Sequence, residues 1–314
     1  MNKEKILITG ALGHIGSKLI RELSKRDEVK TVRILDNLYT QRYYSLFNLP
    51  NNITYEFLEG DIRDKEILKE AVKGIDTVIH LAAITDASFS IKNPELTKDI
   101  NLEGTRNVLE ASKNAGVKRF IMPSTTSVYG EIEGLVDETF LDCKPQTPYA
   151  EAKFQCEKEV RLEGKQGKLE TVVLRWGTIF GTSVGMRFHT AVNKFCYQAA
   201  LNIPLSNWRQ GIDGKRPYLG INDAISSLIF AKDKAKSGEL YNVVTGNYTA
   251  REVIETIRQN IPQVKVNIIE SPVTNQKFYT PLANKICSEG FQFKDNLQEI
   301  VQETLSLFKS IKNY

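Results

Sequence analysis

The chain has 314 residues, of which 42 are basic and 38 acidic, and its formal net charge is +4. Such a small positive excess, without a dense run of lysine and arginine, argues against nucleic-acid binding. Its length suits one large α/β unit or two lobes. We expect a cytoplasmic protein, because no signal peptide precedes the first strand, no apolar run is long enough for a membrane span, and the four cysteines stand far apart. Three dispersed histidines predict no metal site.

A glycine-rich turn near the N-terminus predicts a dinucleotide-binding site. The apolar run of residues 5–8 leads into Gly10, Gly13 and Gly16, which are spaced three apart. Gly10 permits a sharp turn after a strand, Gly13 lets the backbone approach a pyrophosphate, and Gly16 lets the following helix pack closely on the strand. The residues expected to contact the cofactor here are Gly10, Gly13, His14, Ile15 and Gly16.

The second and third strands place carboxylates where an adenosine would lie. Residues 32–35 predict a strand that ends at Asp36, twenty residues after Gly16. A carboxylate there accepts hydrogen bonds from a ribose and repels a 2′-phosphate, which favours NAD over NADP. Asn37 opens a loop at the adenosine end, and after a third strand Asp61 could reach the adenine amine. The alternative is purely structural: a glycine-rich turn with Asp36 as a strand-end cap.

The next segment predicts a buried strand and one long helix. Residues 77–83 form an apolar run, and the small residues at its end, Leu81-Ala82-Ala83, offer a surface for a flat ring. A helix is predicted from residue 94 towards residue 116. Asn101 and Gly104 fall inside it, where neither is favoured, so we expect a packing or functional reason for both. Alternating strands and helices predict a parallel sheet with right-handed crossovers.

A hydroxyl cluster and a Tyr-x-x-x-Lys pair follow. The fifth predicted strand, residues 120–122, runs into four hydroxyl side chains at residues 124–127, at the edge where open parallel sheets bind ligands. Tyr149 and Lys153 stand four residues apart, so a helix would present them on one face. They are the only such pair in the chain, and a sixth predicted strand follows at residues 171–175.

These motifs, in this order, resemble the extended short-chain dehydrogenase/reductase superfamily, and specifically its NAD-dependent nucleotide-sugar epimerase/dehydratase branch, over nearly the whole chain. Residues 36–38, 80–83 and 101–111 are similar to those of UDP-sugar 4-epimerases. The resemblance implies an α/β protein with a Rossmann-type doubly wound parallel sheet and a smaller C-terminal lobe. Residues 1–177, joined by parts of about 217–245, would bind NAD, and residues 178–314 would mainly bind a nucleotide-sugar substrate. A homodimer built from helices around residues 95–115 and 149–163 is also implied.

The resemblance assigns catalysis to three residues. Counting back four residues from Tyr129 in the Val-Tyr-Gly signature assigns the hydrogen-bonding hydroxyl to Thr125 rather than Ser124. Tyr149 would be the base beside the nicotinamide. Lys153 would hold the nicotinamide ribose and, with the positive nicotinamide, favour the phenolate. The implied cofactor-binding residues are Gly10, Gly13, His14, Ile15, Gly16, Asp36, Asn37, Asp61, Ile62, Leu81, Ala82, Ala83, Asn101, Tyr149 and Lys153.

Departures from the family pattern narrow the reaction. Sugar 4,6-dehydratases of this branch carry an Asp-Glu pair after the catalytic threonine, and nucleotide-sugar decarboxylases usually keep the glutamate, but this chain has Thr126 and Ser127. We therefore expect a 4-epimerase-like enzyme that works through a transient keto sugar. The alternatives are an NAD(P)H-dependent keto-sugar or carbonyl reductase and, outside enzymes, an NAD-sensing regulator, which would not need Thr125, Tyr149 and Lys153.

The part of the chain expected to bind substrate departs further from the family pattern. Thr178 stands where the family commonly has an asparagine that contacts the nucleotide diphosphate, and it offers only one hydroxyl group. Arg187 follows in a loop expected to open towards substrate, and Arg216 is placed to bind a diphosphate. Gly220 replaces the family's usual histidine, and a last helix is predicted to begin at Asp295. The substrate-binding residues implied are Thr85, Thr125, Thr126, Thr178, Arg187 and Arg216.

Overall fold

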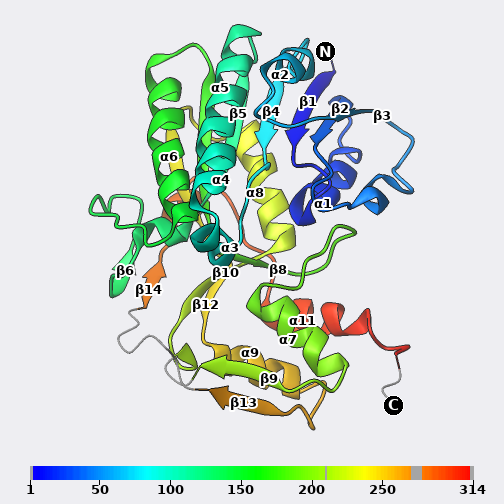
Figure 1. The fold of residues 1–314 in the computed structure, drawn as a ribbon, viewed down its shortest axis with the longest axis vertical. Helices are drawn as coiled ribbons and strands as arrows, with labels where there is room; N and C mark the ends of the chain where they lie inside the picture. The colour runs from blue at the N-terminus through cyan, green and yellow to red at the C-terminus, as the bar shows by residue number, and fades with distance from the viewer. Residues whose placement is uncertain (1–2, 209–210, 270–277, 312–314) are drawn as a thin grey trace.

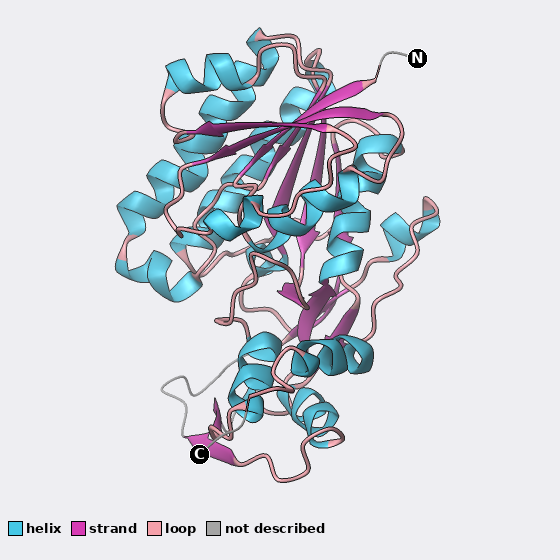
Figure 2. Cartoon of the chain, turned by 90° about the vertical axis from the view of Figure 1, so that its right-hand side faces the viewer, coloured by secondary structure: helices cyan, strands magenta, loops and turns pink. Residues whose placement is uncertain are grey.

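A seven-stranded parallel sheet forms the centre of the computed structural model, which describes residues 3–208, 211–269 and 278–311. Helices cover both faces of this sheet (Figure 2). From edge to edge its strands are β11 (Glu239–Val243), β7 (Glu170–Trp176), β5 (Arg119–Thr125), β4 (Thr77–His80), β1 (Glu4–Thr9), β2 (Val29–Asp36) and β3 (Thr54–Glu59). The order of β3, β2, β1, β4 and β5 is that of a doubly wound Rossmann-type sheet, so the fold predicted from the sequence is confirmed.

The sheet separates two apolar cores, because successive residues of a strand point to opposite faces. Ile6 and Ile8 of β1 face the core beneath α1 (His14–Leu23) and α8 (Ile221–Asp233). Leu7 faces the other core, beneath α2 (Lys65–Ala71), α5 (Gly104–Asn114) and α6 (Pro148–Gln166). Burial on both faces explains why these strands read as continuous apolar runs.

A smaller lobe lies below the large sheet in Figure 1. Its apolar core joins α7 (Ala191–Ala200), α9 (Ala250–Arg258) and α11 (Leu297–Ser306). A three-stranded sheet contains β12 (Gly246–Tyr248), β10 (Arg216–Gly220) and β8 (Thr178–Phe180), and β13 (Val266–Ile269) pairs with β9 (Leu205–Trp208). The chain crosses between the lobes more than once, because α8 and β11 return to the large sheet after β10.

Short elements complete the described chain. They are η1 (Tyr43–Leu46), α3 (Ala87–Lys92), α4 (Pro94–Lys98), η2 (Asp99–Glu103), η3 (Thr126–Tyr129), β6 (Gly134–Val136), β14 (Tyr279–Pro281) and α10 (Asn284–Ser288). The parallel pairing of β14 with β6 brings the C-terminal region beside the segment that follows η3. Within the three described ranges, no helix has both the length and the apolar character needed to cross a membrane.

The helix predicted from residue 94 towards residue 116 is present up to Asn114, but it is not α-helical throughout. A π-helical turn, η2, separates α4 from α5. Inside this turn the Asn101 side chain donates a hydrogen bond of 2.7 Å to the Ile84 carbonyl and accepts one of 2.8 Å from the Ile84 amide. A Cβ atom on Gly104 would lie only 2.5 Å from Cδ1 of Ile62. The two unfavourable helix residues therefore have packing reasons, and the π turn is the local distortion that accommodates them.

Two predicted boundaries of secondary-structure elements also differ from the structure. β4 ends at His80 rather than at Ala83, and the last helix begins at Leu297 with Asn296 as its N-cap. Asp295, which the sequence indicated as the helix start, accepts hydrogen bonds from the first backbone amides of α8 at 2.8 and 3.0 Å. A side chain on Gly220 would collide with that carboxylate, which explains why glycine replaces the family's usual histidine at that position.

Candidate active site

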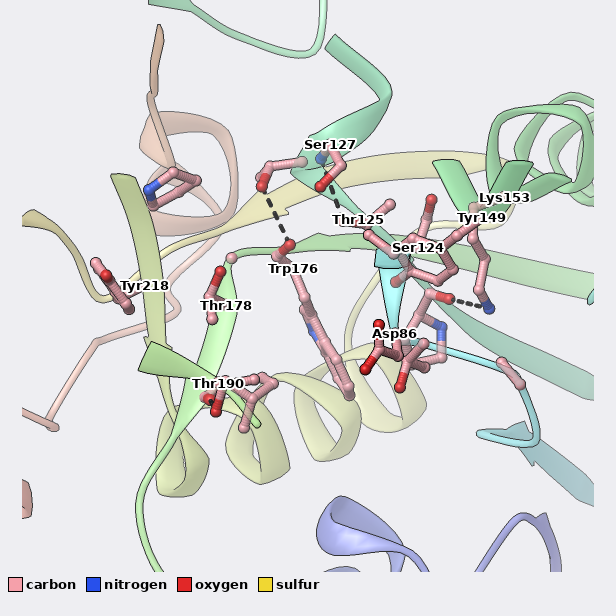
Figure 3. Close-up of a pocket in the computed structure, with 18 of the residues that line it drawn as sticks. Asp86, Ser124, Thr125, Ser127, Tyr149, Lys153, Trp176, Thr178, Thr190 and Tyr218 are labelled. Carbon is pink, nitrogen blue, oxygen red and sulfur yellow. Dashed lines mark hydrogen bonds between the residues drawn. The ribbon is translucent and has the colours of Figure 1, made fainter. Parts of the chain in front are cut away.

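A cavity of about 510 Å³ is lined by residues of both lobes, at the carboxyl ends of the central strands. β5 and β7 form one wall, where Thr125 is aligned with Trp176, and β8 and β10 form another, where Thr178 is aligned with Tyr218 (Figure 3). The residues predicted from the sequence that line this cavity are Ile15, Leu81, Ala83, Thr85, Thr125, Thr126, Tyr149, Lys153, Thr178, Arg187 and Arg216.

The structure brings the three predicted catalytic residues to one wall of the cavity (Figure 3). Thr125 is the last residue of β5, and its hydroxyl oxygen accepts a hydrogen bond of 3.1 Å from the Ser127 amide, which leaves its own proton to donate. Tyr149 lies in the first turn of α6, which begins at Pro148 and is capped by the Thr147 side chain. Lys153 follows one turn later on the same helix face.

Burial sets the electrostatics of this wall. It raises the pKa of the Tyr149 phenol, while the hydrogen bond with Thr125 and the positive charge of Arg187 act in the opposite direction. Lys153 is only 4% exposed, burial lowers its pKa, and its Nζ atom donates to the Pro123 carbonyl at 3.0 Å. Arg187 is therefore a nearby cation that favours the phenolate, besides the contribution that the family resemblance predicts for Lys153.

The glycine turn fits a dinucleotide. Gly10 has φ +67°, and a Cβ atom there would lie 2.7 Å from backbone atoms of Ala82. Gly13 is the N-cap of α1, whose first turn has neither a side-chain cap nor an acidic residue. The space over Gly13 is bounded by the Arg42 guanidinium, 4.0 Å from a Cβ built at that glycine. A helix N-terminus with a cation beside it matches the negative charge of a pyrophosphate.

The residues predicted for the adenosine end lie outside the cavity, at the ends of β2 and β3. The Asp36 carboxylate accepts hydrogen bonds from the Leu12 and Leu38 amides at 3.0 and 2.9 Å, so it is fixed beside the glycine turn. Asn37 donates to Asp61 at 2.9 Å, and the hydrogen bond from Arg63 is the main reason that the pKa of Asp61 falls to about 2. Both carboxylates are therefore held in a fixed orientation, and Asp61 is held as an anion.

Three residues of the predicted cofactor set turn their side chains towards the protein. His14 is buried in the first turn of α1, and its Nε2 atom lies 3.0 Å from the Gly181 carbonyl. Asn101 makes both of its side-chain hydrogen bonds to Ile84, and Ile62 is buried against Gly104. These side-chain contacts are made within the protein, and the assignment of the three residues to the cofactor site stays a prediction.

The predicted substrate residues Arg187 and Arg216 line the same cavity. Arg187 donates a hydrogen bond from Nη1 to the Thr85 hydroxyl, and its buried Nε atom has no hydrogen-bond partner among the described residues. The Arg216 guanidinium lies over the Phe278 ring, 4.8 Å from its centroid. Two guanidinium groups without a carboxylate partner in the described chain favour an anionic ligand here.

Sequence reasoning missed several lining residues. The buried Ser124 hydroxyl beside Tyr149 has no partner within the described chain, although it belongs to the hydroxyl cluster from which only Thr125 and Thr126 were chosen (Figure 3). Asp86 lines the cavity and caps α3 by accepting from the Phe89 amide at 2.9 Å. Tyr279 also lines it, and no local signal identifies this residue, because β14 reaches the site only through its pairing with β6.

Comparison with known proteins agrees with this geometry. The family model described as NAD dependent epimerase/dehydratase family matches residues 6–244. The dTDP-D-glucose 4,6-dehydratase of Homo sapiens is 27% identical over 323 residues, covering 98% of this chain and 90% of that protein.

Two solved structures are similar over almost their whole length. UDP-glucuronic acid 4-epimerase from Bacillus cereus, in complex with UDP-glucuronic acid and NAD, is 26% identical with a TM-score of 0.87, covering 97% of this chain and 99% of that one. UDP-glucose 4-epimerase from Thermus thermophilus, in complex with NAD, is 25% identical with a TM-score of 0.84, covering 98% and 99%. The chain, whose glycine turn fits a dinucleotide, therefore belongs to the NAD dependent epimerase/dehydratase family, and its cofactor is NAD.

Proposed function

We propose that the protein is a nucleotide-sugar epimerase of the 4-epimerase type, acting on a sugar carbon held beside Tyr149. One observation carries the proposal: Thr125, Tyr149 and Lys153 line the same cavity as two guanidinium groups, Arg187 and Arg216, that have no carboxylate partner in the described chain. Among the described residues, a single carboxylate lines this cavity. That carboxylate, Asp86, is engaged in capping α3.

Tyr149, Thr125 and Lys153 would have different roles in the reaction. Tyr149 removes the proton from the sugar hydroxyl and later returns it, while Thr125 donates a hydrogen bond to the reacting oxygen. Lys153 is anchored on Pro123, which leaves its other two N–H groups for the ribose of the cofactor. NAD, when bound, supplies the hydride acceptor that such an oxidation requires. Inversion of the carbon would require the keto sugar to present its opposite face when it is reduced again.

The same site argues against dehydration, although the human relative is named a 4,6-dehydratase. Loss of water from a sugar needs an acid for the leaving hydroxyl and a base for the neighbouring proton. At the two positions after Thr125 this chain offers Thr126, whose hydroxyl donates to the Trp176 carbonyl at 3.3 Å, and Ser127, which is exposed. Neither hydroxyl is a proton acceptor near neutral pH, so epimerisation or simple reduction fits the site better.

For the substrate, Arg187 and Arg216 would bind its anionic groups, with Thr85, Thr126 and Thr178 contacting the sugar or the diphosphate. The solved relatives are complexes or enzymes of UDP-glucose, UDP-N-acetylglucosamine and UDP-glucuronic acid, so these compounds and dTDP-glucose form the first panel to test. The last UDP compound carries a carboxylate besides its diphosphate, and comparing it with UDP-glucose would separate the two anionic groups that Arg187 could recognise.

The test begins with mass spectrometry of the supernatant of heat-denatured protein, to detect bound NAD. The native protein is then incubated with each nucleotide sugar while the absorbance of NADH and the sugar composition are followed. A new sugar epimer without net NADH would support the epimerase. Stoichiometric consumption of NAD(P)H on keto sugars would instead identify a reductase, and NAD binding without turnover on any of these substrates would favour an NAD-sensing regulator.

A further inference from the structure

The loop between β8 and α7 crosses from the smaller lobe to the cofactor turn. We call its residues Gly181–Arg187 the strap; in Figure 1 the loop lies below α1. Its tip is Gly185, whose amide donates a hydrogen bond of 2.8 Å to the Ser17 hydroxyl in α1. A Cβ atom on Gly185 would lie 2.7 Å from the carbonyl oxygens of both Leu12 and Gly13. The strap therefore rests directly on the backbone of the dinucleotide turn.

A second contact joins the start of the strap to the same turn. The Gly181 carbonyl lies 3.0 Å from Nε2 of His14, and because a carbonyl only accepts, this nitrogen carries the proton. Burial, followed by the charge of Arg187, lowers the pKa of His14 to about 3, so the ring is neutral at physiological pH. His14 and Ser17 thus hold the strap at two points without placing a new charge beside the pyrophosphate site.

The base of the strap is closed by one amide side chain. Asn193 lies in α7 and is completely buried. Its Oδ1 atom accepts from the Gly181 amide at 3.0 Å, and its Nδ2 atom lies 3.1 Å from the Arg187 carbonyl and 3.3 Å from the Gly181 carbonyl. A single side chain therefore fixes both ends of a seven-residue loop.

The strap ends at Arg187, which lies near the cavity wall that holds Thr125, Tyr149 and Lys153, called here the catalytic wall. Arg187 lines the cavity with Tyr149, and its positive charge opposes the effect of burial on that phenol. Asp86, Tyr149 and Arg42 act on the charge of Arg187, and His14 also lies near enough to interact with it. His189 lies close enough that Arg187 contributes to lowering its pKa to about 4. Lys153, anchored on Pro123, lines the same cavity as Tyr149.

We propose that Asn193 is a positioning residue that holds Arg187 against the catalytic wall, and that the strap ties this position to the dinucleotide turn through Ser17. The hydrogen bonds of Asn193 and the strap fix the position of Arg187 whatever reaction the protein catalyses. A contribution of Arg187 to turnover rests on the proposed function. Arg187 would then be the second active-site cation, held by the smaller lobe, whereas Lys153 is held by the larger one.

The test uses the full-length protein saturated with NAD and measures the ionisation of Tyr149 directly. Tyrosine Cζ resonances are followed by ¹³C NMR against pH, and the Tyr149 signal is identified by its absence from the Tyr149→Phe variant. Arg187→Ala and Asn193→Ala should both raise the titration midpoint of Tyr149 by the same amount. The double variant should raise it no further, because the two residues act in one chain of contacts.

The matched control is Asn242→Ala, since Asn242 is also a completely buried amide but bonds Tyr129 and Leu282, away from the strap. It should lower the melting temperature and leave the Tyr149 midpoint unchanged. The proposal is overturned if Asn193→Ala lowers the melting temperature while the midpoint stays at the wild-type value, or if Arg187→Ala does not move it. These readouts need no substrate, so failure of the strap proposal is distinguishable from failure to find an epimerase reaction.

Discussion

The phenolic hydroxyl of Tyr279 donates a hydrogen bond of 2.8 Å to the carbonyl oxygen of Thr126, a residue 153 positions earlier. Thr126 directly follows Thr125, the residue proposed to hydrogen-bond the reacting oxygen, so the strand β14 holds the turn that ends β5. Tyr279 also lies against Tyr129, with 5.7 Å between the ring centroids. The hydroxyl-rich turn therefore depends on a segment far away in sequence.

Replacement of Tyr279 by phenylalanine tests this relationship. The ring packing would remain while one hydrogen bond is lost, so we expect the free energy of unfolding to fall by about 1 kcal/mol. We also expect a loss of activity, because the Thr125 hydroxyl would be less well positioned. Urea unfolding and steady-state kinetics measure the two effects. Tyr55→Phe removes a comparable bond to the Ile20 carbonyl, far from the cavity, and should reduce stability without changing kcat/KM.

Tyr149→Phe is the test of the proposed base. Removal of the phenolic oxygen leaves no group to accept the sugar proton, so turnover should fall by roughly 10²–10⁴-fold, the usual contribution of general acid–base catalysis. NAD binding should persist, because the glycine turn is untouched. Calorimetric titration with NAD and a product assay on the identified substrate measure both. Activity close to that of the unmodified protein would exclude Tyr149 as the base.

Buried histidines predict how stability depends on pH. His80 is completely buried between the hydroxyls of Thr9 and Thr105, at 2.7 and 2.9 Å, and burial lowers its pKa to about 3. The Thr105 hydroxyl donates to the Asn101 carbonyl, so it accepts from Nε2 of a neutral His80 ring. This network joins β1 and β4 to the π turn, and it requires the uncharged imidazole.

The sign follows from proton counting. Below about pH 6.5 an unfolded histidine binds a proton, whereas folded His80 stays neutral until the pH nears 3, so stability is lost as the pH falls through this window. Each such histidine contributes a slope of up to about 1.4 kcal/mol per pH unit. Urea unfolding between pH 7.5 and 5 should show the decline, and His80→Gln should reduce its slope. An unchanged slope in that variant would show that His80 is not the source.

The dimer implied by the family resemblance is a further prediction. Arg106 joins α5 to α6 through Glu159, with contacts of 2.9 and 3.2 Å from Nε, and Lys113 joins them through Glu163 at 2.7 Å. These exposed ion pairs hold the two helices as one unit that a second copy could meet as a four-helix bundle. Light scattering at micromolar concentration should give twice the mass of one chain. A mass equal to one chain would remove the prediction.

Local patterns in the sequence were enough to predict the large sheet and much of the catalytic wall. The glycine turn, the apolar strands and the Tyr149–Lys153 spacing are each decided within a few residues, because strand period, helix period and turn geometry are short-range properties of the backbone. Parallel strands bring their carboxyl ends to one edge, which placed Thr125 at the ligand-binding edge of the sheet, and the family resemblance assigned Tyr149 to the same site.

The tertiary structure alone decided which polar side chains have hydrogen-bond partners within the protein and which remain available to a ligand. Asn101 and His14 look like ligand residues in the sequence, yet Ile84 pairs with the Asn101 side chain and Gly181 pairs with Nε2 of His14. Asn193 and Tyr279 carry no local signal, because their partners stand far away in the chain or across a loop that only folding closes. The physical reason is that a buried polar group must find its hydrogen-bond partner wherever folding brings one, and that partner is set by packing between lobes rather than by neighbouring residues.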